Sequence, residues 1–248
     1  MSIENEQDII ALMRIGRIVG LTLQHMGAAI QPGMTTAELD EIGAAFLAQH
    51  GARSAPILAY KFPGHTCISI NDEAAHGIPG NRVIQPGDLV NIDVSAELDG
   101  YFADTGGSFA VPPVTSEKQR LLETTRKALN AAINAVRAGQ PLYVIGKAVE
   151  KIARPAGYSI LRELGGHGVG RSLHEPPHAV PHYFNPRAHE RLTEGMVLTI
   201  EPFLTTGATH IKKASDGWTL RTSDGSLAAQ YEHTVIITKD RPILVTAV

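Results

Sequence analysis

The sequence predicts an α+β fold in which two similar halves share one curved antiparallel sheet, with the helices on its outer face. Two helical patterns precede a hairpin pattern in each half. An offset of 106 relates Gly33, Leu39 and Gly51 to Gly139, Ile145 and Gly157. An offset of 108 relates residues 87–93 to residues 195–201. These repeats predict a pseudo-twofold arrangement of halves, at about residues 1–115 and 116–248, within a single domain.

The composition indicates a globular chain without a membrane segment. At 248 residues and 43% hydrophobic, the chain can bury a sizeable core. No apolar run approaches the roughly 20 residues of a membrane span, and the acidic start lacks the pattern of a signal peptide. A net charge of −3 gives no reason to expect direct nucleic-acid binding, and the single cysteine, Cys67, excludes an internal disulfide framework. We therefore expect a cytoplasmic monomer.

Two amphipathic helices and a stretch of short elements come first. Apolar residues recur at helical spacing from residue 8 to about residue 24. The Thr35-x-x-Glu38 pattern is typical of a capping box and predicts a second helix that runs to His50. Between residues 53 and 71, prolines and a glycine interrupt the apolar runs, so short strands and turns are expected there.

A β-hairpin is predicted over residues 90–105. Apolar and polar residues alternate, and Asp99-Gly100 is a favoured two-residue turn. That turn pairs Ser95 with Asp104, so Asp93 and Asp104 become diagonal neighbours on one face. Two carboxylates at that separation repel each other and indicate a bound cation. The alternative is that one aspartate points to water and the other caps a turn.

The second half is expected to repeat this order. A third helix, with Ser116 and Gln119 as its capping box, is predicted to run to about residue 138. The other expected elements are a helix over 141–156, loops or strand edges at 165–170 and 174–177, a strand over 197–201, and a hairpin of 218–220 with 227–237 through Asp224-Gly225.

Five residues are candidate metal ligands: Asp93, Asp104, His167, Glu201 and Glu232. Glu201 and Glu232 lie in apolar strand patterns, where an unpaired carboxylate is costly. Each of them alone could be a paired core carboxylate. Together, four carboxylates and one histidine form an oxygen-rich set, unlike the Cys/His set of a structural zinc site. Such a set can hold two divalent ions, Co, Mn, Fe or Zn, which support hydrolysis.

Four segments resemble, in order and spacing, the signature segments of type I methionine aminopeptidases. They are NIDVSAELDGYFADTGGSF, GGHGVGRSLHEPPHAVPHY, GMVLTIEP and AAQYEHTVIIT. The resemblance spans essentially the whole chain and implies membership of peptidase family M24, with the pita-bread fold and one catalytic domain over residues 1–248. It implies a metalloaminopeptidase that removes the initiator methionine from nascent proteins whose second residue is small. Only 26 residues separate His174 from Glu201, where type II relatives carry a long insertion.

The resemblance also implies a role for each candidate metal ligand. Asp93 would chelate one of two divalent ions, while Asp104 and Glu232 would bridge both. His167 and Glu201 would complete the site of the other ion.

By the same resemblance, Glu201 would shuttle a proton, and His76 and His174 would contact the scissile peptide. The methionine pocket would be lined by Phe62, Cys67 and Trp218. This chain departs from the family pattern nearby. Residues 56–62 lack the usual Gly-Tyr, and Leu173 stands where an aromatic residue commonly precedes the second histidine. The effect of both departures on the pocket is left open.

Two other functions fit parts of this pattern. Prolidase-like relatives would keep the fold and the metals but act on another substrate; they generally carry an additional N-terminal domain, for which this chain leaves no room. A non-catalytic relative that binds ribosomes or RNA would be expected to lack some ligands and to have a basic surface. Because all five ligands are present, we expect the enzyme, with nascent N-termini as its substrates and the ribosome as a transient partner.

Overall fold

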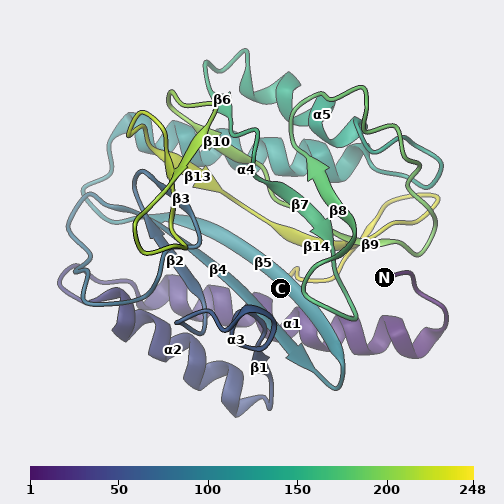
Figure 1. Cartoon of the computed structure of the whole chain (residues 1–248), viewed down its shortest axis with the longest axis horizontal. Coiled ribbons are helices and arrows are strands. Elements are labelled where there is room, and N and C mark those ends of the chain that lie inside the picture. Colours follow the sequence, from purple (N-terminus) through teal and green to yellow (C-terminus); the bar gives the residue numbers. More distant parts are fainter.

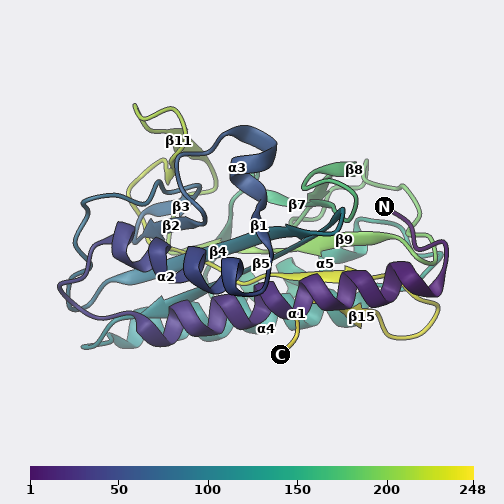
Figure 2. The ribbon, with the colours of Figure 1, turned by 90° about the horizontal axis from the view of Figure 1, so that it is seen from below.

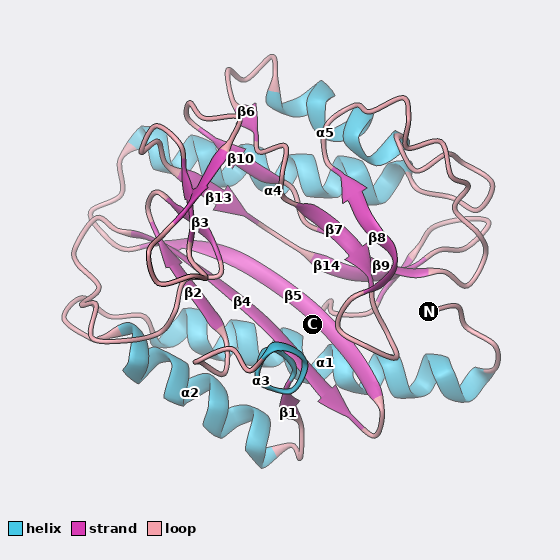
Figure 3. Cartoon of the chain, viewed as in Figure 1, coloured by secondary structure: helices cyan, strands magenta, loops and turns pink.

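The computed structural model, which describes residues 1–248, confirms the α+β class. The strands run between the helix pair α1 and α2 and the helix pair α4 and α5 (Figures 1 and 3). Seen from below, α1 and α4 lie beneath the strands, whereas the short α3 lies above them (Figure 2). The helices are α1 (Glu6–Ala29), α2 (Thr36–Gln49), α3 (Ala55–Tyr60), α4 (Ser116–Ala135) and α5 (Val144–Ala153).

Hydrogen bonding divides the strands of the curved surface into four antiparallel sheets. One sheet has four strands: β1 (Arg53–Ser54), β2 (Cys67–Ile70), β4 (Leu89–Leu98) and β5 (Tyr101–Ala110). Another has five: β7 (Gly165–Gly168), β8 (Glu175–Pro181), β9 (Val197–Ile200), β14 (His233–Ile236) and β15 (Ile243–Leu244). The third contains β6 (Ser159–Ile160), β10 (Phe203–Thr205) and β13 (Ala228–Gln230). The fourth contains β3 (Glu73–Ala75), β11 (Ile211–Lys213) and β12 (Leu220–Thr222).

The first helix is longer than the predicted span of residues 8–24, and it is strongly apolar. It spans 24 residues, and an 18-residue window reaches a mean hydropathy of 1.2, enough by length and composition to cross a membrane. Core helices of soluble proteins meet the same criterion. Leu12, Ile15 and Val19 of α1 are completely buried in a core that includes Ile92 of β4. The helix therefore serves as a core element of this fold.

The hairpin has the predicted register. Leu98 pairs with Tyr101, Ser95 with Asp104, and Asp93 with Gly106. Asp99 and Gly100 both have positive φ, 53° and 82°, as a type I′ turn requires. The capping box of α2 is also confirmed, since Thr35 and Glu38 bond reciprocally.

The expectation of only strands and turns over residues 53–71 was wrong in part, because α3 forms there. Ser54 accepts a hydrogen bond from the amide of Ile57, and a proline in the first turn suits a helix start. The helix ends at Tyr60, and the C-cap residue Lys61 has a left-handed φ of 56°. A six-residue helix is too short to produce a periodic pattern, so the sequence did not reveal it.

The second predicted hairpin was also wrong. Although the turn at Gly225 forms, with φ 80°, the strands on either side of it do not pair with each other. β12 lies between β11 and β3, β13 pairs with β10, and β14 lies between β9 and β15. Both edges of β12 are already hydrogen-bonded, so tertiary pairing overrides the local turn signal.

The two helices of the second half differ from the prediction at their ends: α4 begins one residue earlier and stops at Ala135, before the predicted residue 138, and α5 begins later. Thr115, not Ser116, caps α4 by accepting from the amide of Lys118, and Gln119 bonds Glu123 instead of closing a capping box. α5 begins at Val144, because Pro141 forms an isolated bridge with Arg191.

Repeat-related positions share backbone features. Three pairs of glycines related by the repeat all have φ between +71° and +95°. They are Gly33 and Gly139, Gly51 and Gly157, and Gly87 and Gly195. The bridge between Thr35 and Val83 has its counterpart between Pro141 and Arg191, at the same offsets of 106 and 108. Duplication predicts such equivalences. The division into halves at about residue 115 stays a prediction.

Each half contributes a large hydrophobic core. One cluster of 21 buried residues joins α1, α2 and β4, with Leu39 and Ile92 among them. Another of 22 residues joins α4, α5 and β9, with Ile145 and Leu198 among them. Packing of these cores fixes the strands between them, and the polar side chains on the strands then face away from the helices.

Candidate metal centre and active site

A cavity of about 390 Å³ gathers the predicted site residues. Nine of the ten predicted residues line it: Phe62, Cys67, His76, Asp93, Asp104, His167, His174, Glu201 and Trp218. The tenth, Glu232, does not line the cavity and is only 2% exposed. Segments that lie far apart in the sequence therefore meet at one site.

The hairpin supplies two of the carboxylates. Asp93 lies on β4 and Asp104 on β5, and Ser95, two residues after Asp93, is the partner of Asp104 in the ladder. Side chains two residues apart on a strand share a face. The two aspartates therefore point into the cavity as diagonal neighbours, as predicted.

The second half supplies the other two carboxylates through one strand pair. Glu201 directly follows β9, and Glu232 directly precedes β14. Ile200 pairs with His233, so the antiparallel ladder brings these two glutamates to the same end of the pair. The amide of Glu232 also donates to the carbonyl of Gly106, 2.9 Å away, which joins this end to the hairpin.

His167, on β7, lies among the carboxylates. Its Nε2 is 3.6 Å from Oδ2 of Asp104 and 3.7 Å from Oε1 of Glu201. Ligand atoms of Asp104, His167 and Glu232 all lie within 4.8 Å of one another. Several donors at this spacing are close enough to coordinate one ion jointly.

Burial makes the carboxylates resist ionisation. Burial raises the pKa of Asp93 to about 6. It also raises the pKa of Asp104, Glu201 and Glu232 well above the usual range, and the negative charges of neighbouring carboxylates add to this effect. Ionising these four groups would bring negative charges close together in a buried site, and a bound cation would offset their repulsion.

The imidazole of His167 is prepared as a neutral ligand. Burial lowers its pKa to about 3, and the nearby His174 contributes to the same shift. Its Nδ1 lies 3.0 Å from the carbonyl of Gly168, so Nδ1–H donates there and the Nε2 lone pair faces the carboxylates.

Within the site, two buried carboxylate oxygens have no hydrogen-bond partner, Oδ1 of Asp104 and Oε1 of Glu232. A buried acceptor without a donor is destabilising. Both oxygens belong to the cluster around His167, and divalent ions of the first transition row accept this mixture of carboxylate and imidazole ligands. The residues present therefore fit a metal centre.

Three polar residues that the sequence reading did not single out orient the ligands. Thr199 Oγ1 donates to Oε1 of Glu201 at 2.8 Å, and accepts from the amide of His167. Gln230 Nε2 donates to Oε2 of Glu232 at 2.9 Å, and its own Oε1 accepts from Asn91. Such partners restrict the rotamers of the ligands.

These three residues share a position that the sequence could have revealed. Each lies two residues before a candidate ligand: Asn91 before Asp93, Thr199 before Glu201, and Gln230 before Glu232. Because side chains two apart lie on one strand face, polar residues at these positions are natural neighbours of the ligands.

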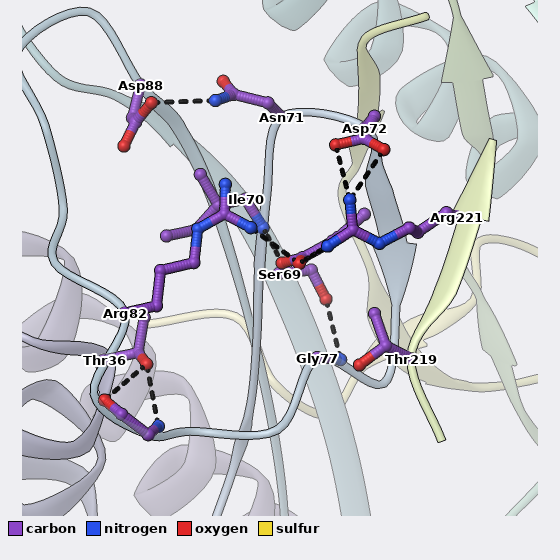
Figure 4. Close-up of polar contacts among 12 residues, drawn as sticks. Thr36, Ser69, Ile70, Asn71, Asp72, Gly77, Arg82, Asp88, Thr219 and Arg221 are labelled. Atoms are coloured by element: carbon purple, nitrogen blue, oxygen red, sulfur yellow. Dashed lines mark hydrogen bonds and ion pairs between the residues drawn. The ribbon is translucent and has the colours of Figure 1, made fainter. Parts of the chain in front are cut away.

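The segment that carries His76 is held in a left-handed conformation. His76 has φ 55°, which is rare for a residue with a side chain. The amide of Gly77 donates to Ser69 Oγ (Figure 4), and a Cβ on Gly77 would lie 2.2 Å from the carbonyl oxygen of Ile68. Only glycine permits this close approach, which fixes the backbone beside His76.

An ion-pair network anchors the same segment to β12. Glu73, which is buried, accepts from Arg82 at 2.7 Å and from Arg221 at 2.6 Å. Arg221 also bonds both carboxylate oxygens of Asp72 (Figure 4). Thr36 fixes the far end through two hydrogen bonds to Gly80.

We expect Arg221→Ala to lower kcat of the enzyme about tenfold and the free energy of unfolding by about 2 kcal/mol, because Glu73 loses a buried charged donor. Steady-state kinetics and thermal unfolding would measure both effects. Arg14→Ala is the matched control, since Arg14 pairs with Asp99 on the exposed surface. Equal behaviour of the two variants would show that the network does not position His76.

The predicted methionine-pocket residues form an apolar wall of the cavity. The rings of Phe62 and Trp218 meet edge to face, with centroids 5.2 Å apart. Cys67 pairs with Asp93 in the ladder, and burial raises the pKa of its thiol, so it acts as a small apolar group. Leu173 is 4% exposed and lines the same cavity.

His174 lies at the junction between this wall and the metal ligands. Its ring centroid is 3.8 Å from that of His167, and burial lowers its pKa to about 4. The imidazole is therefore neutral at neutral pH and offers one N–H donor. His76 lines the same cavity, so both predicted histidines are available to a bound peptide.

Comparisons with known proteins agree with this arrangement. The model of metallopeptidase family M24 matches residues 11–239. A methionine aminopeptidase of Staphylococcus epidermidis is 47% identical over 249 residues, 100% of this chain and 99% of that protein. Methionine aminopeptidase 2 of Bacillus subtilis is 45% identical over 247 residues, 99% of each chain. The crystal structure of methionine aminopeptidase from Rickettsia prowazekii superposes with a TM-score of 0.94, at 37% identity and with complete coverage of both chains.

Proposed function

The chain belongs to metallopeptidase family M24, and from this membership and the site geometry we infer that it is a methionine aminopeptidase. It hydrolyses the peptide bond after an N-terminal methionine. One observation carries this inference beyond the family: three carboxylates and His167 line the same cavity as the apolar wall of Phe62 and Trp218, and the buried Glu232 lies beside Asp104 and His167.

The five candidate ligands would hold two divalent ions. Asp93 would bind one ion, His167 and Glu201 the other, and Asp104 and Glu232 would bridge them. The two unpartnered oxygens, on Asp104 and Glu232, support the bridging roles because each of these residues has an oxygen free for a second ion. When bound, such ions supply Lewis acidity and lower the pKa of a bound water.

Glu201 would move the proton of the attacking water to the leaving amine. Its Oε1 accepts from Thr199, and burial and the charges of Asp104 and Asp93 raise its pKa well above the usual range. A carboxyl group with a raised pKa is suited to accept a proton and donate it again near neutral pH.

His76 and His174 would bind the scissile peptide. Each lines the cavity, and each imidazole can donate one N–H to the carbonyl oxygen that gains negative charge in the transition state. The apolar wall of Phe62, Cys67 and Trp218 would receive the methionine side chain, for which a thioether is well matched.

Several finer properties belong to the same proposal. The enzyme is of type I, prefers a small second residue and acts in the cytoplasm on nascent chains, with transient contact to the ribosome. It acts as a monomer. The short spacing between His174 and Glu201 supports type I.

The proposal is tested by hydrolysis of Met-Ala-Ser, Leu-Ala-Ser and Ala-Pro peptides. The apo protein is titrated separately with Mn, Co, Fe and Zn, and the products are separated by chromatography. We expect metal-dependent cleavage of the methionyl peptide alone. Cleavage of the prolyl peptide would favour a prolidase-like substrate, and no cleavage with any metal would favour the non-catalytic alternative.

A further inference from the structure

Tyr60, at the end of α3, reaches across the cavity to His174. Its hydroxyl oxygen lies 2.8 Å from Nδ1 of His174, and the two rings meet at 65° with centroids 5.5 Å apart. These residues are 114 positions apart in the sequence. Tyr60 also lines the cavity, yet none of the roles assigned above includes it.

The local structure fixes where Tyr60 points. Lys61, which follows it, has φ 56°, and its amide donates to carbonyls of Ile57 and Pro56. This turn ends α3 and directs the next residues to Phe62 on the cavity wall. Tyr60 thereby places an aromatic ring beside His174, whereas Leu173, directly before His174, has none.

The direction of this hydrogen bond determines the tautomer of the imidazole. A phenol has an ordinary pKa of about 10 and is protonated at neutral pH, so its O–H is a donor. A neutral imidazole has one donor and one acceptor nitrogen. If Nδ1 accepts from the Tyr60 hydroxyl, the proton of His174 resides on Nε2, which is the nitrogen left free for a ligand.

His174 is held on two sides. Tyr60 bonds Nδ1, and the ring of His167 lies against the His174 ring at an interplanar angle of 33°. A donor that is fixed before substrate binds stabilises developing negative charge without reorganising.

We propose that Tyr60 is a positioning residue, whose hydroxyl donates to Nδ1 of His174 and keeps the imidazole as the Nε2–H tautomer that donates to the carbonyl oxygen of the scissile peptide. The catalytic part of this proposal rests on the proposed function. The tautomer itself is a property of the folded protein and does not depend on any activity.

The first test is a kinetic double-mutant cycle on the metal-loaded enzyme with a methionyl peptide. Tyr60→Phe should lower kcat about tenfold with KM nearly unchanged, and should cause no further loss in a His174→Ala background. Tyr143→Phe is the matched control, because it also removes one hydroxyl but lies outside the cavity. Equal losses of kcat from Tyr60→Phe with and without His174 would overturn the proposal.

The second test uses ¹⁵N NMR of the histidine side chains in the zinc-loaded protein, with His174→Ala to assign the signal. We expect a protonated Nε2 and a hydrogen-bonded Nδ1 for His174, and a changed Nδ1 shift in Tyr60→Phe. A proton on Nδ1 in the unsubstituted protein, or identical spectra in the variant, would overturn the proposal. Because this measurement needs no turnover, it separates a wrong role for Tyr60 from a wrong assignment of the reaction.

Discussion

Glu232→Gln is expected to abolish hydrolysis of methionyl peptides and at the same time to stabilise the metal-free protein. Glu232 is 2% exposed, one of its oxygens has no partner, and burial and the charges of Glu201 and Asp93 raise its pKa well above the usual range. An amide of the same shape removes the free-energy cost of ionising this buried group beside other carboxylates or of keeping it protonated above its ordinary pKa. It is also a poor bridging ligand, so kcat/KM should fall at least about a thousandfold, or about 4 kcal/mol of transition-state stabilisation.

Opposite signs for activity and stability distinguish a functional site from an ordinary core position. Steady-state kinetics and thermal unfolding of the metal-free protein would provide both numbers. Asp104→Asn should behave in the same way, because Oδ1 of Asp104 is also without a partner. Near-normal turnover in either variant would exclude the bridging roles.

A matched control lies on the same hairpin. Glu97 is also buried, at 4% exposed, but it pairs with Arg53 and does not line the cavity. Glu97→Gln should lower stability and leave kcat unchanged. If it reduced turnover as strongly as Glu232→Gln, loss of activity would reflect damage to the hairpin and not loss of a metal ligand.

The stability of the metal-free protein is expected to fall as the pH rises from 6.5 to 8. Burial raises the pKa of Asp104, Glu201 and Glu232 well above the usual range, so the folded state binds protons that the unfolded state has already released. Each carboxyl group that stays protonated lowers the free energy of unfolding by about 1.4 kcal/mol per pH unit. For a chain of this size, each such group should lower Tm by about 3–6 °C per pH unit.

The buried histidines act in the opposite direction, but in a lower window. Burial lowers the pKa of His167 and of His182 to about 3, so both stay neutral when folded. Their contribution to stability is complete above about pH 6.5 and is lost as the pH falls below that value. Above pH 6.5, among these residues, only the carboxyl groups determine how the free energy of unfolding changes with pH.

Added Mn²⁺ should reverse this trend, because deprotonated carboxylates bind the ion and protons compete with it. The rise in Tm on adding metal should therefore be larger at pH 8 than at pH 6.5, as measured by differential scanning calorimetry. A metal-free Tm that increases over this window would contradict the account of the carboxylates.

How much of this could be predicted from the sequence depended on how local the determining contacts are. The hairpin register was predictable because Asp99-Gly100 sets it within two residues. The strand pairing around Gly225 was not predictable, because both edges of β12 are hydrogen-bonded to other strands, β11 and β3. The helix α3 was missed because six residues are too few to establish a period.

The same distinction applies to the site. The ligand residues were predicted from their motifs, and the structure brings nine of the ten predicted residues to one cavity. The partners Thr199 and Gln230 could have been found from strand periodicity, because each lies two residues before a ligand. The contact of Tyr60 with His174 depends on the packing of two distant segments, which no local pattern encodes. The roles of the individual ligands stay predictions.

The most direct test of the central claim is the number of metal ions bound per chain. Native mass spectrometry of the metal-free protein, titrated with Mn²⁺ at pH 7.5, would count them without reference to activity. The five ligands predict two ions per chain, and fewer in Glu232→Gln, with Glu97→Gln unchanged. Binding of no ion, or two ions held equally well by Glu232→Gln, would contradict a dinuclear centre built on these residues.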